Sequence, residues 1–380
     1  MGVGVVAAWV AGGSLGSGQT NDEFYRSWRW VEDVTAPRVA GLGGAYVALA
    51  DDSAAMQLNP AGLTLLPKTE ITGGILWRGP GLLGQDATVP RTGMSFIGGA
   101  GQLTKEWALG GYLAEPFDER VVLPPGGTSG RLETTVTDGG VALGWAPVAR
   151  VRVGLRVNMS HVRVQGQWAR ANGSSTSLLV GAGAGVTSVT GAAGLLAECT
   201  DRLRLGASFR RGTSWDISRT ASNPALGVAV DTGSVYRYRS PSVVSAGASF
   251  RAGLRLVLTA QVDFVRLSEV RDVFEVRIGP FSVDEYALRD ALEGRGGIEF
   301  SQPLHRLSVQ VRAGAHGASG ASLRYVGEDR AEAFRFRGGE RMIELSAGAS
   351  LVLASGSRLD VAVMSDKMRT VASAAATLRF

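Results

Sequence analysis

Strict alternation between apolar and polar residues constrains the fold of this chain more than any other feature. Within 202–210, apolar side chains occupy every second position and the positions between them carry Arg, Gly or Ser. The segments 254–264 and 306–315 alternate in the same way. A period of two indicates β-strands with one apolar and one polar face. The chain is therefore predicted to be all-β from residue 67 onward.

One strand carries a predicted irregularity. Residues 151–159 alternate, and the alternation is lost at Ser160 and His161. A β-bulge re-aims side chains within a strand in this manner. We therefore expect a bulge at these two residues.

Two arrangements satisfy such strands: a soluble sandwich or barrel with its apolar face inside, and a membrane barrel with its apolar face toward lipid. About 310 residues follow residue 66, room for about 14 strands at the usual spacing. Sandwiches usually stop at roughly 7 to 9 strands. The alternating C-terminus ends in Leu378 and Phe380, which is typical of a barrel-assembly signal. We predict a transmembrane antiparallel β-barrel of about 14 strands, spanning 67–380, in the bacterial outer membrane.

The first 18 residues are small and apolar. They resemble the core and cleavage zone of an export signal, although a basic start is missing. We expect residues 1–18 to be a truncated signal peptide; an interior strand is the alternative. Beyond them, no uncharged apolar run reaches the ~18 residues of a transmembrane helix.

A segment rich in Gly and Ala, residues 36–66, precedes the strands. Its part 45–56 is predicted to hold a short helix, and Asp51 or Asp52 is suited to cap a further turn. Pro60 would end that helical stretch. Without a preceding strand, the glycines near its start do not favour a dinucleotide site.

The motif Asn59-Pro60-Ala61-Gly62 closes this segment. Asn59 is expected to hydrogen-bond either the turn itself or the barrel wall. The motif has two interpretations, a gating element and a simple helix-terminating turn.

Long and short connections are predicted to alternate, as the loops and turns of outer-membrane barrels do. The long ones are 78–92, 115–135, 166–178, 211–240, 268–292 and 324–340, and the tight ones are 146–149 and 354–357. Aromatic residues near the strand ends are compatible with interfacial girdles or with ordinary packing. They are Trp107, Tyr112, Phe117, Trp145, Trp168, Trp215, Tyr236, Tyr238, Phe250, Phe300 and Phe334.

Composition argues against several function classes. The net charge of +5 comes from Arg residues spread singly along strands, which does not favour a nucleic-acid partner. The single Cys199 allows no internal disulfide. His161, His305 and His316 lack metal-ligand spacing, and neither Ser160 with His161 nor Ser308 with His305 forms a nucleophile motif. We expect no enzyme activity, no metal and no cofactor.

The residues 41–52 and 59–63, with the strand segments 202–210, 241–250 and 254–256, resemble the FadL/TodX-like outer-membrane transporters. The resemblance implies a 14-stranded barrel plugged by an N-terminal hatch, here within 19–66. It implies diffusion of hydrophobic molecules, such as long-chain fatty acids or hydrocarbons, with sideways exit into the membrane. PorV-like barrels, which serve protein secretion, share the hatch signature and are the alternative.

Under this resemblance, the expected partners are a hydrophobic ligand or lipid, outer-membrane lipid and the barrel-assembly machinery. The expected gating residues are Gly41, Gly43, Gly44, Asn59, Pro60, Ala61 and Gly62.

Overall fold

A computed structural model describes most of the chain. The described residues are 34–80, 90–123, 128–172, 175–183, 185–223, 228–271, 283–318, 324–335, 341–367 and 369–380. The predicted signal peptide 1–18 and the first part of the extension that follows it lie outside these residues. Those two assignments therefore stay predictions.

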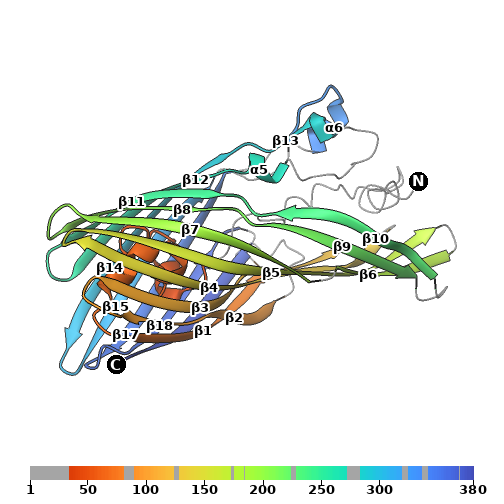
Figure 1. Ribbon diagram of the computed structural model, residues 1–380. Coiled ribbons are helices and arrows are strands. Elements are labelled where there is room, and N and C mark those ends of the chain that lie inside the picture. Colours follow the sequence, from red (N-terminus) through yellow and green to blue (C-terminus); the bar gives the residue numbers. More distant parts are fainter. Residues whose placement is uncertain are drawn as a thin grey trace.

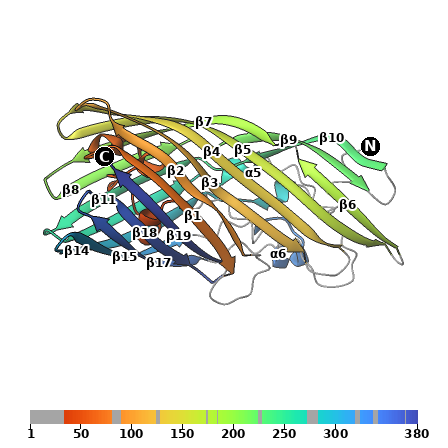
Figure 2. The same ribbon diagram turned by 90° about the horizontal axis from the view of Figure 1, so that it is seen from below.

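The described strands form one closed antiparallel barrel (Figures 1 and 2). Its strands are β1 (Glu70–Pro80), β2 (Arg91–Gln102), β3 (Trp107–Leu123), β4 (Thr128–Val148), β5 (Val151–Asn172), β6 (Ser175–Gly183), β7 (Val186–Glu198), β8 (Leu203–Arg210), β9 (Ser214–Asn223), β10 (Val228–Arg239), β11 (Val243–Ala252), β12 (Leu256–Val265), β14 (Ala291–Leu304), β15 (Leu307–Ala318), β17 (Met342–Leu353), β18 (Arg358–Ser365) and β19 (Arg369–Arg379).

Among the described residues this sheet has 17 strand segments, but three neighbouring pairs are single strands with a short interruption. These pairs are β6 with β7, β8 with β9, and β10 with β11, which leaves 17 − 3 = 14 strands. β19 closes the barrel by pairing with β1, from Glu70 opposite Arg379 to Pro80 opposite Arg369. The predicted fold class and strand number are confirmed.

Side chains on the barrel are arranged inside out compared with a soluble protein. Ile71, Leu155 and Leu345 point outward, each with more than half of its surface exposed. Glu299 and Arg312 point inward and are buried. An apolar exterior around a polar interior suits a barrel set in lipid. None of the helices in the described part is long and apolar enough to cross a membrane.

Short turns join strands at one end of the barrel, here called the turn end, where Phe380 also lies (Figure 1). The predicted tight turns at 146–149 and 354–357 are confirmed there. At the opposite end, the loop end, three predicted long loops are wrong: most of 115–135, 166–178 and 211–240 is strand.

The physical reason is strand length. β5 has 22 residues, which extend about 70 Å along the strand, far beyond an apolar band of ~25 Å. Once a strand leaves the membrane, its outer face needs no apolar residues, so its sequence is typical of a loop. β4, β5, β6, β9 and β10 accordingly project past the rest of the barrel (Figure 1).

A small group of elements lies outside the barrel at the loop end (Figure 1). It comprises α5 (Ser268–Arg271), η2 (Val283–Glu285), β13 (Tyr286–Ala287), β16 (Arg324–Tyr325) and α6 (Arg330–Arg335). β13 pairs with β16, and the rings of Tyr286 and Tyr325 meet edge to face with centroids 5.3 Å apart. We call these elements the external module.

The bulge expected in β5 does not exist. The pairing of β5 with β4 and β7 runs through Ser160 and His161 without a shift. Ser160 is buried, His161 is exposed and Val162 is buried, so the backbone alternates throughout. The alternation of apolar and polar residues is lost in the sequence because Val162, an apolar residue, occupies an inward position.

Only part of the predicted aromatic girdle faces lipid. Trp107 and Trp145 stack on the outer surface near the turn end, with ring centroids 5.4 Å apart. In contrast, Tyr112, Phe117 and Trp215 are buried inside. The side chains of Trp168, Tyr236 and Tyr238 lie outside the description.

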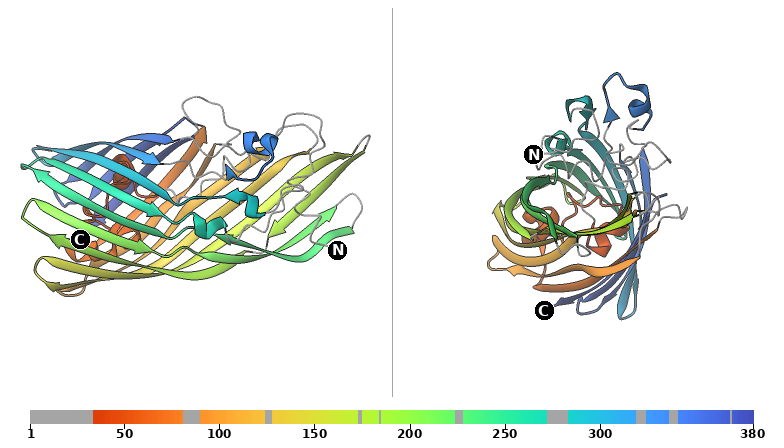
Figure 3. Two further views of the ribbon diagram at one scale, coloured as in Figure 1. Left: turned by 90° about the horizontal axis from the view of Figure 1, so that it is seen from above. Right: turned by 90° about the vertical axis from the view of Figure 1, so that its right-hand side faces the viewer.

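Residues 34–66, which we call the plug, lie inside the barrel near the turn end (Figure 3). The plug contains α3 (Pro37–Gly41), α4 (Ala55–Leu58) and η1 (Pro60–Leu65). The helix predicted within 45–56 is wrong for most of its length, because only 55 and 56 of these residues are helical and 47–49 form a turn. Asp52 does cap the next turn, where its carboxylate accepts a hydrogen bond from the Ala54 amide at 3.0 Å.

Candidate functional site

The C-terminal half of the plug packs against the barrel wall where the wall carries glycine. Gly144 and Gly154 on neighbouring strands β4 and β5 face Pro60. A Cβ at Gly154 would overlap the backbone of Pro60 and Ala61. Such close backbone approach requires a residue without a side chain. Part of the high glycine content therefore makes room for the plug.

Asn59 ties this half of the plug to both the plug and the wall. Its side-chain amide donates to the carbonyl of Val47 at 2.7 Å and to the carbonyl of Leu195 on β7 at 3.2 Å. Its carboxamide oxygen accepts from the Ala61 amide at 3.3 Å. Both hydrogen-bonding alternatives considered for Asn59 therefore occur together. Pro60 does not merely end α4; it begins η1.

The N-terminal half of the plug is held by buried charge. The guanidinium of Arg38 forms a bidentate pair with Glu299 on β14, at 2.9 and 3.0 Å. It also contacts Asp51 at 2.5 Å and Asp52 at 2.9 Å. On the wall, Arg312 pairs with the same Glu299 at 2.6 Å. Bidentate charge-assisted pairs of this kind are strong, and they also fix the orientation of the two side chains.

Asp52 is the second centre of this network, which we call the anchor network. Its carboxylate accepts from the Tyr46 hydroxyl at 2.5 Å and from Arg358 on β18 at 3.1 Å. Burial raises the pKa of Asp52, but Arg358 and Arg38 outweigh burial and hold that pKa well below its usual value. Burial, together with the charge of Asp52, raises the pKa of Tyr46, which keeps its hydroxyl protonated as a donor.

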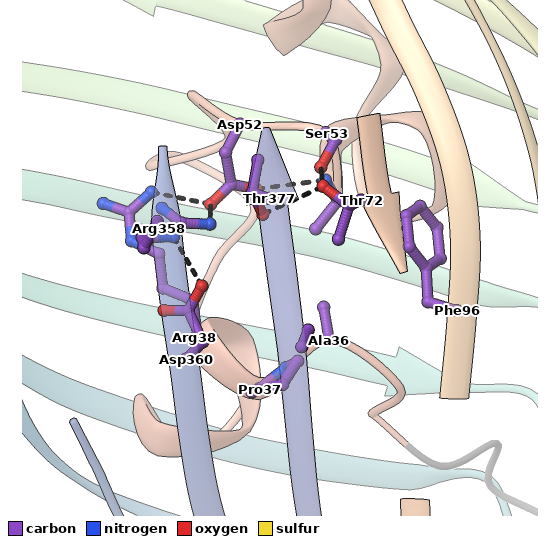
Figure 4. Close-up of a pocket in the computed structure, with 12 residues that line it drawn as sticks. Ala36, Pro37, Arg38, Asp52, Ser53, Thr72, Phe96, Arg358, Asp360 and Thr377 are labelled. Carbon is purple, nitrogen blue, oxygen red and sulfur yellow. Dashed lines mark hydrogen bonds and ion pairs between the residues drawn. The ribbon is translucent and has the colours of Figure 1, made fainter. Parts of the chain in front are cut away.

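A small cavity lies beside the anchor network (Figure 4). Its volume is about 10 Å³, roughly the space that one water molecule needs. Arg38, Asp52 and Arg358 line it together with Phe96 and Ala36. This part of the contact between plug and wall is therefore closed to any larger molecule.

The charge of Asp52 leads to a prediction for acidic solution. Its lowered pKa means that its ion pairs stabilise the docked plug above the ordinary carboxyl value of 3.8 and lose this effect as the pH falls below it. We expect hydrogen-exchange protection of 52–58, corrected for intrinsic rates, to fall by up to tenfold per pH unit below pH 3.8. In Asp52→Asn this dependence should flatten. Equal slopes in the two proteins would contradict the prediction.

The predicted gating glycines all lie at tight places in the plug. Gly43 and Gly44 follow α3 with φ of +64° and +80°, a left-handed conformation that favours glycine. A Cβ at Gly41 would lie 3.2 Å from the Cα of Gly348 on β17. A Cβ at Gly62 would overlap the carbonyl oxygen of Ala50 within the plug itself. These glycines are therefore explained by packing and backbone conformation, and their gating role stays a prediction.

Above the plug, β2 and β3 part from each other. Their pairing ends at Phe96 opposite Ala114, and beyond it β3 carries a bulge that contains Pro116, a residue without an amide donor. We call the gap between Arg91–Ser95 of β2 and Glu115–Asp118 of β3 the first seam. The stacked rings of Phe96 and Tyr112, 5.9 Å apart, lie at its lower end.

Charged side chains bridge the first seam. Arg78 donates to the backbone carbonyl of Glu115 at 2.8 Å and lies 3.5 Å from its carboxylate. Arg78 also lies 3.7 Å from Asp118. Arg91, on the β2 side of the seam, pairs with Asp118 on the β3 side. Arginine thus replaces part of the missing backbone pairing. Sequence reasoning missed this site; the proline in a long alternating strand was its one signal.

The other sequence candidates do not form a chemical site. Ser160 and His161 point to opposite faces of β5, and the Ser308 hydroxyl donates to the carbonyl of Gln302 rather than pairing with His305. Within the described ranges, no three His, Cys, Asp or Glu side chains come together as possible metal ligands. Leu378 and Phe380 are exposed beside β1, and the Phe380 amide donates to Thr69 at 3.1 Å.

Comparison with known proteins gives structural neighbours only. No protein-family model and no curated protein sequence matches the chain. A Pseudomonas aeruginosa FadL homologue superposes with a TM-score of 0.71 at 14% identity, covering 92% of this chain and all (100%) of that one. The Ralstonia pickettii toluene transporter TbuX gives 0.68 at 15% identity, covering 92% and 99%.

The CymD monoaromatic hydrocarbon channel is a third neighbour, with a TM-score of 0.64 at 16% identity and coverage of 92% and 97%. TbuX is named as a transporter and CymD as a channel, and at such identities the three neighbours establish the fold. The chain has the fold of the FadL/TodX-like barrels.

Proposed function

We propose that this protein is a bacterial outer-membrane channel for hydrophobic small molecules, in which the plug closes the lumen and cargo leaves sideways. The observation that carries the proposal is the first seam, a break in the barrel wall directly above a closed plug. The named cargo of two neighbours, toluene and monoaromatic hydrocarbons, supports an apolar cargo here. We propose no catalytic role.

The physical argument starts from the plug. The anchor network contains the charged side chains of Arg38, Asp52 and Glu299. It therefore offers an apolar solute no favourable contact. The rings of Phe96 and Tyr112, next to the first seam, offer the apolar contact that such a solute needs. From these two rings, the shortest path to an apolar environment leads through the first seam into the lipid. Arg78 and Glu115 must separate for passage, so they act as a latch.

The test measures how fast cells take up diphenylhexatriene, an apolar dye that fluoresces once it enters lipid. Cells that make the protein should take up the dye several-fold faster than cells with an empty vector. Gly93→Cys with Glu115→Cys, in a Cys199→Ser background, allows a reversible bifunctional thiol reagent to close the first seam, since a Cβ at Gly93 would touch the Glu115 carboxylate.

Cross-linking should lower the uptake rate, and dithiothreitol should restore it. Uptake equal to that of vector cells before any cross-linking would disprove the channel. Uptake unaffected by the cross-link would disprove the route through the first seam.

A second candidate function is a scaffold or secretion-linked barrel of the PorV-like kind. It is favoured by the projecting strands and the external module, which present a large structured surface at the loop end (Figure 1). Purification from native membranes distinguishes the two. Stable recovery with a large translocon favours the scaffold, and recovery of the barrel alone favours the channel.

A further inference from the structure

The barrel wall has a second break, between β7 and β9. β7 pairs with β8 only up to Ala192 opposite Arg210, and pairing resumes between β6 and β9 at Gly183 opposite Arg219. For the described residues 185–190 no ladder partner on the β9 side is present, although 186–190 pair with β5 on the other side. We call the gap between 185–190 and 212–216 the second seam.

The second seam is not the result of a slipped register. Eight residues, 184–191, separate the two paired regions on one strand, and eight, 211–218, separate them on the other. Equal lengths allow the two strands to pair continuously, as antiparallel neighbours normally do. They part in spite of this. A specific feature must therefore hold them apart.

That feature is a change in the side-chain alternation: residues of β9 that would point outward by continuation from β8 point inward instead. Leu205 and Phe209 on β8 are exposed toward lipid, and continued alternation would turn Trp215 outward as well. The interruption at Arg211–Thr213 instead turns Trp215 inward, where only 2% of it is exposed. Its indole N–H donates to the backbone carbonyl of Ser160 on β5 at 2.9 Å.

To reach β5 from β9, the indole must lie across the inner side of β7. The inward residues of β7 at this level are Ser188 and Thr190, both small enough to leave room for it. Trp215 therefore covers the second seam from the lumen side. A single side chain, rather than the β-ladder, closes the wall here.

The lower edge of the second seam lies at the apolar exterior. Val189 on one side and Phe209 on the other are exposed to lipid. Between the levels of these two side chains, Arg211 donates its amide to Gly191 at 3.1 Å, and Thr190 donates to the Arg211 carbonyl at 3.0 Å. These bonds close the lower edge, since unpaired backbone groups are unfavourable in lipid. The gap above them leads from the lumen toward the membrane.

We propose that the second seam is a further lateral exit for apolar, above all aromatic, molecules, and that Trp215 is its gate. This inference rests on the proposed channel function. The two seams differ in chemistry: the first is bridged by Arg78, Arg91, Glu115 and Asp118, whereas Trp215 covers the second. An aromatic cargo can stack on the indole and displace it from Ser160.

The experiment closes the first seam by cross-linking and then measures the dye uptake that remains. Cells carry the cross-linked Gly93→Cys/Glu115→Cys protein in the Cys199→Ser background, with tryptophan, phenylalanine or alanine at position 215. Uptake of diphenylhexatriene should stay above the vector level with tryptophan, and should rise at least threefold in Trp215→Ala. Trp215→Phe, which loses the bond to Ser160 but keeps an aromatic ring, should lie between them.

Two controls keep the result interpretable. Trp107→Ala removes a lipid-facing tryptophan near the turn end and should leave uptake unchanged. Hydrolysis of a polar chromogenic β-lactam in the periplasm should not accelerate in Trp215→Ala, because the plug stays in place. Heat-modifiable migration on gels reports that each barrel has folded.

The inference is overturned if the closed first seam reduces dye uptake to the vector level whichever residue stands at 215. In that case uptake by the uncross-linked protein still supports the channel. If the uncross-linked protein itself never exceeds the vector, the channel proposal fails. The two failures are therefore distinguishable.

Discussion

Arg38→Ala is expected to release the N-terminal half of the plug and turn the closed barrel into an ion-conducting pore. The substitution removes a cation that contacts Asp51 and Asp52 of the plug and Glu299 of the wall at the same time. Breaking a buried ion pair by removing one partner costs up to about 3–5 kcal/mol. The cost here is below that limit, because Asp52 keeps Arg358 and Glu299 keeps Arg312. Asp51, Asp52 and Glu299 would repel one another, and separation lets water reach them. Planar-bilayer recordings should show open-channel current that is rare in the wild type.

Two variants control for this result. Arg38→Lys keeps the charge but loses the bidentate pair with Glu299, so its leak should be smaller than that of Arg38→Ala. Arg150→Ala removes an exposed arginine that pairs with Asp201 at the turn end, and should leave the current unchanged. An Arg38→Ala barrel that folds and stays closed would show that the anchor network does not hold the plug.

The barrel could be predicted from sequence because residues that face lipid are apolar, whereas the alternate residues that face the lumen are mostly polar. Leu205 and Phe209 face lipid and Arg312 faces the lumen, as their places in the pattern require. That demand ends where strands leave the membrane. The outer parts of β4 and β5 were accordingly mistaken for loops, since neither face there has to be apolar.

The anchor network could not be predicted, because its partners lie far apart in the chain. Arg38 and Glu299 are separated by 261 positions, and no local pattern links them. The change in alternation that buries Trp215 was equally hidden, since tryptophan near a strand end also suits an interfacial girdle. One signal was available: Gly154 takes an inward position between apolar neighbours, where a polar lumen residue is the norm. Inward glycines indicate a segment packed against the wall.

Gly154→Val is expected to displace the C-terminal half of the plug while the barrel itself forms. The new side chain would occupy the space of the Pro60 and Ala61 backbone, and a backbone segment cannot rotate away as a flexible side chain can. Overpacking of this kind costs about 1–3 kcal/mol or more. The β-ladder on both sides of Gly154 involves backbone groups only, so the fourteen strands should still close.

Because Arg38 remains in Gly154→Val, the two halves of the plug should respond differently. Hydrogen-exchange protection should be lost at 56–66, on the β4 to β7 side, and retained at 38–44, where the anchor network holds α3. Gly111→Val is the matched control, because a Cβ there meets its nearest neighbour at 3.7 Å, an ordinary contact. Uniform loss of protection over the whole plug would mean that it moves as one body, and unchanged protection at 56–66 would mean that the wall yields instead.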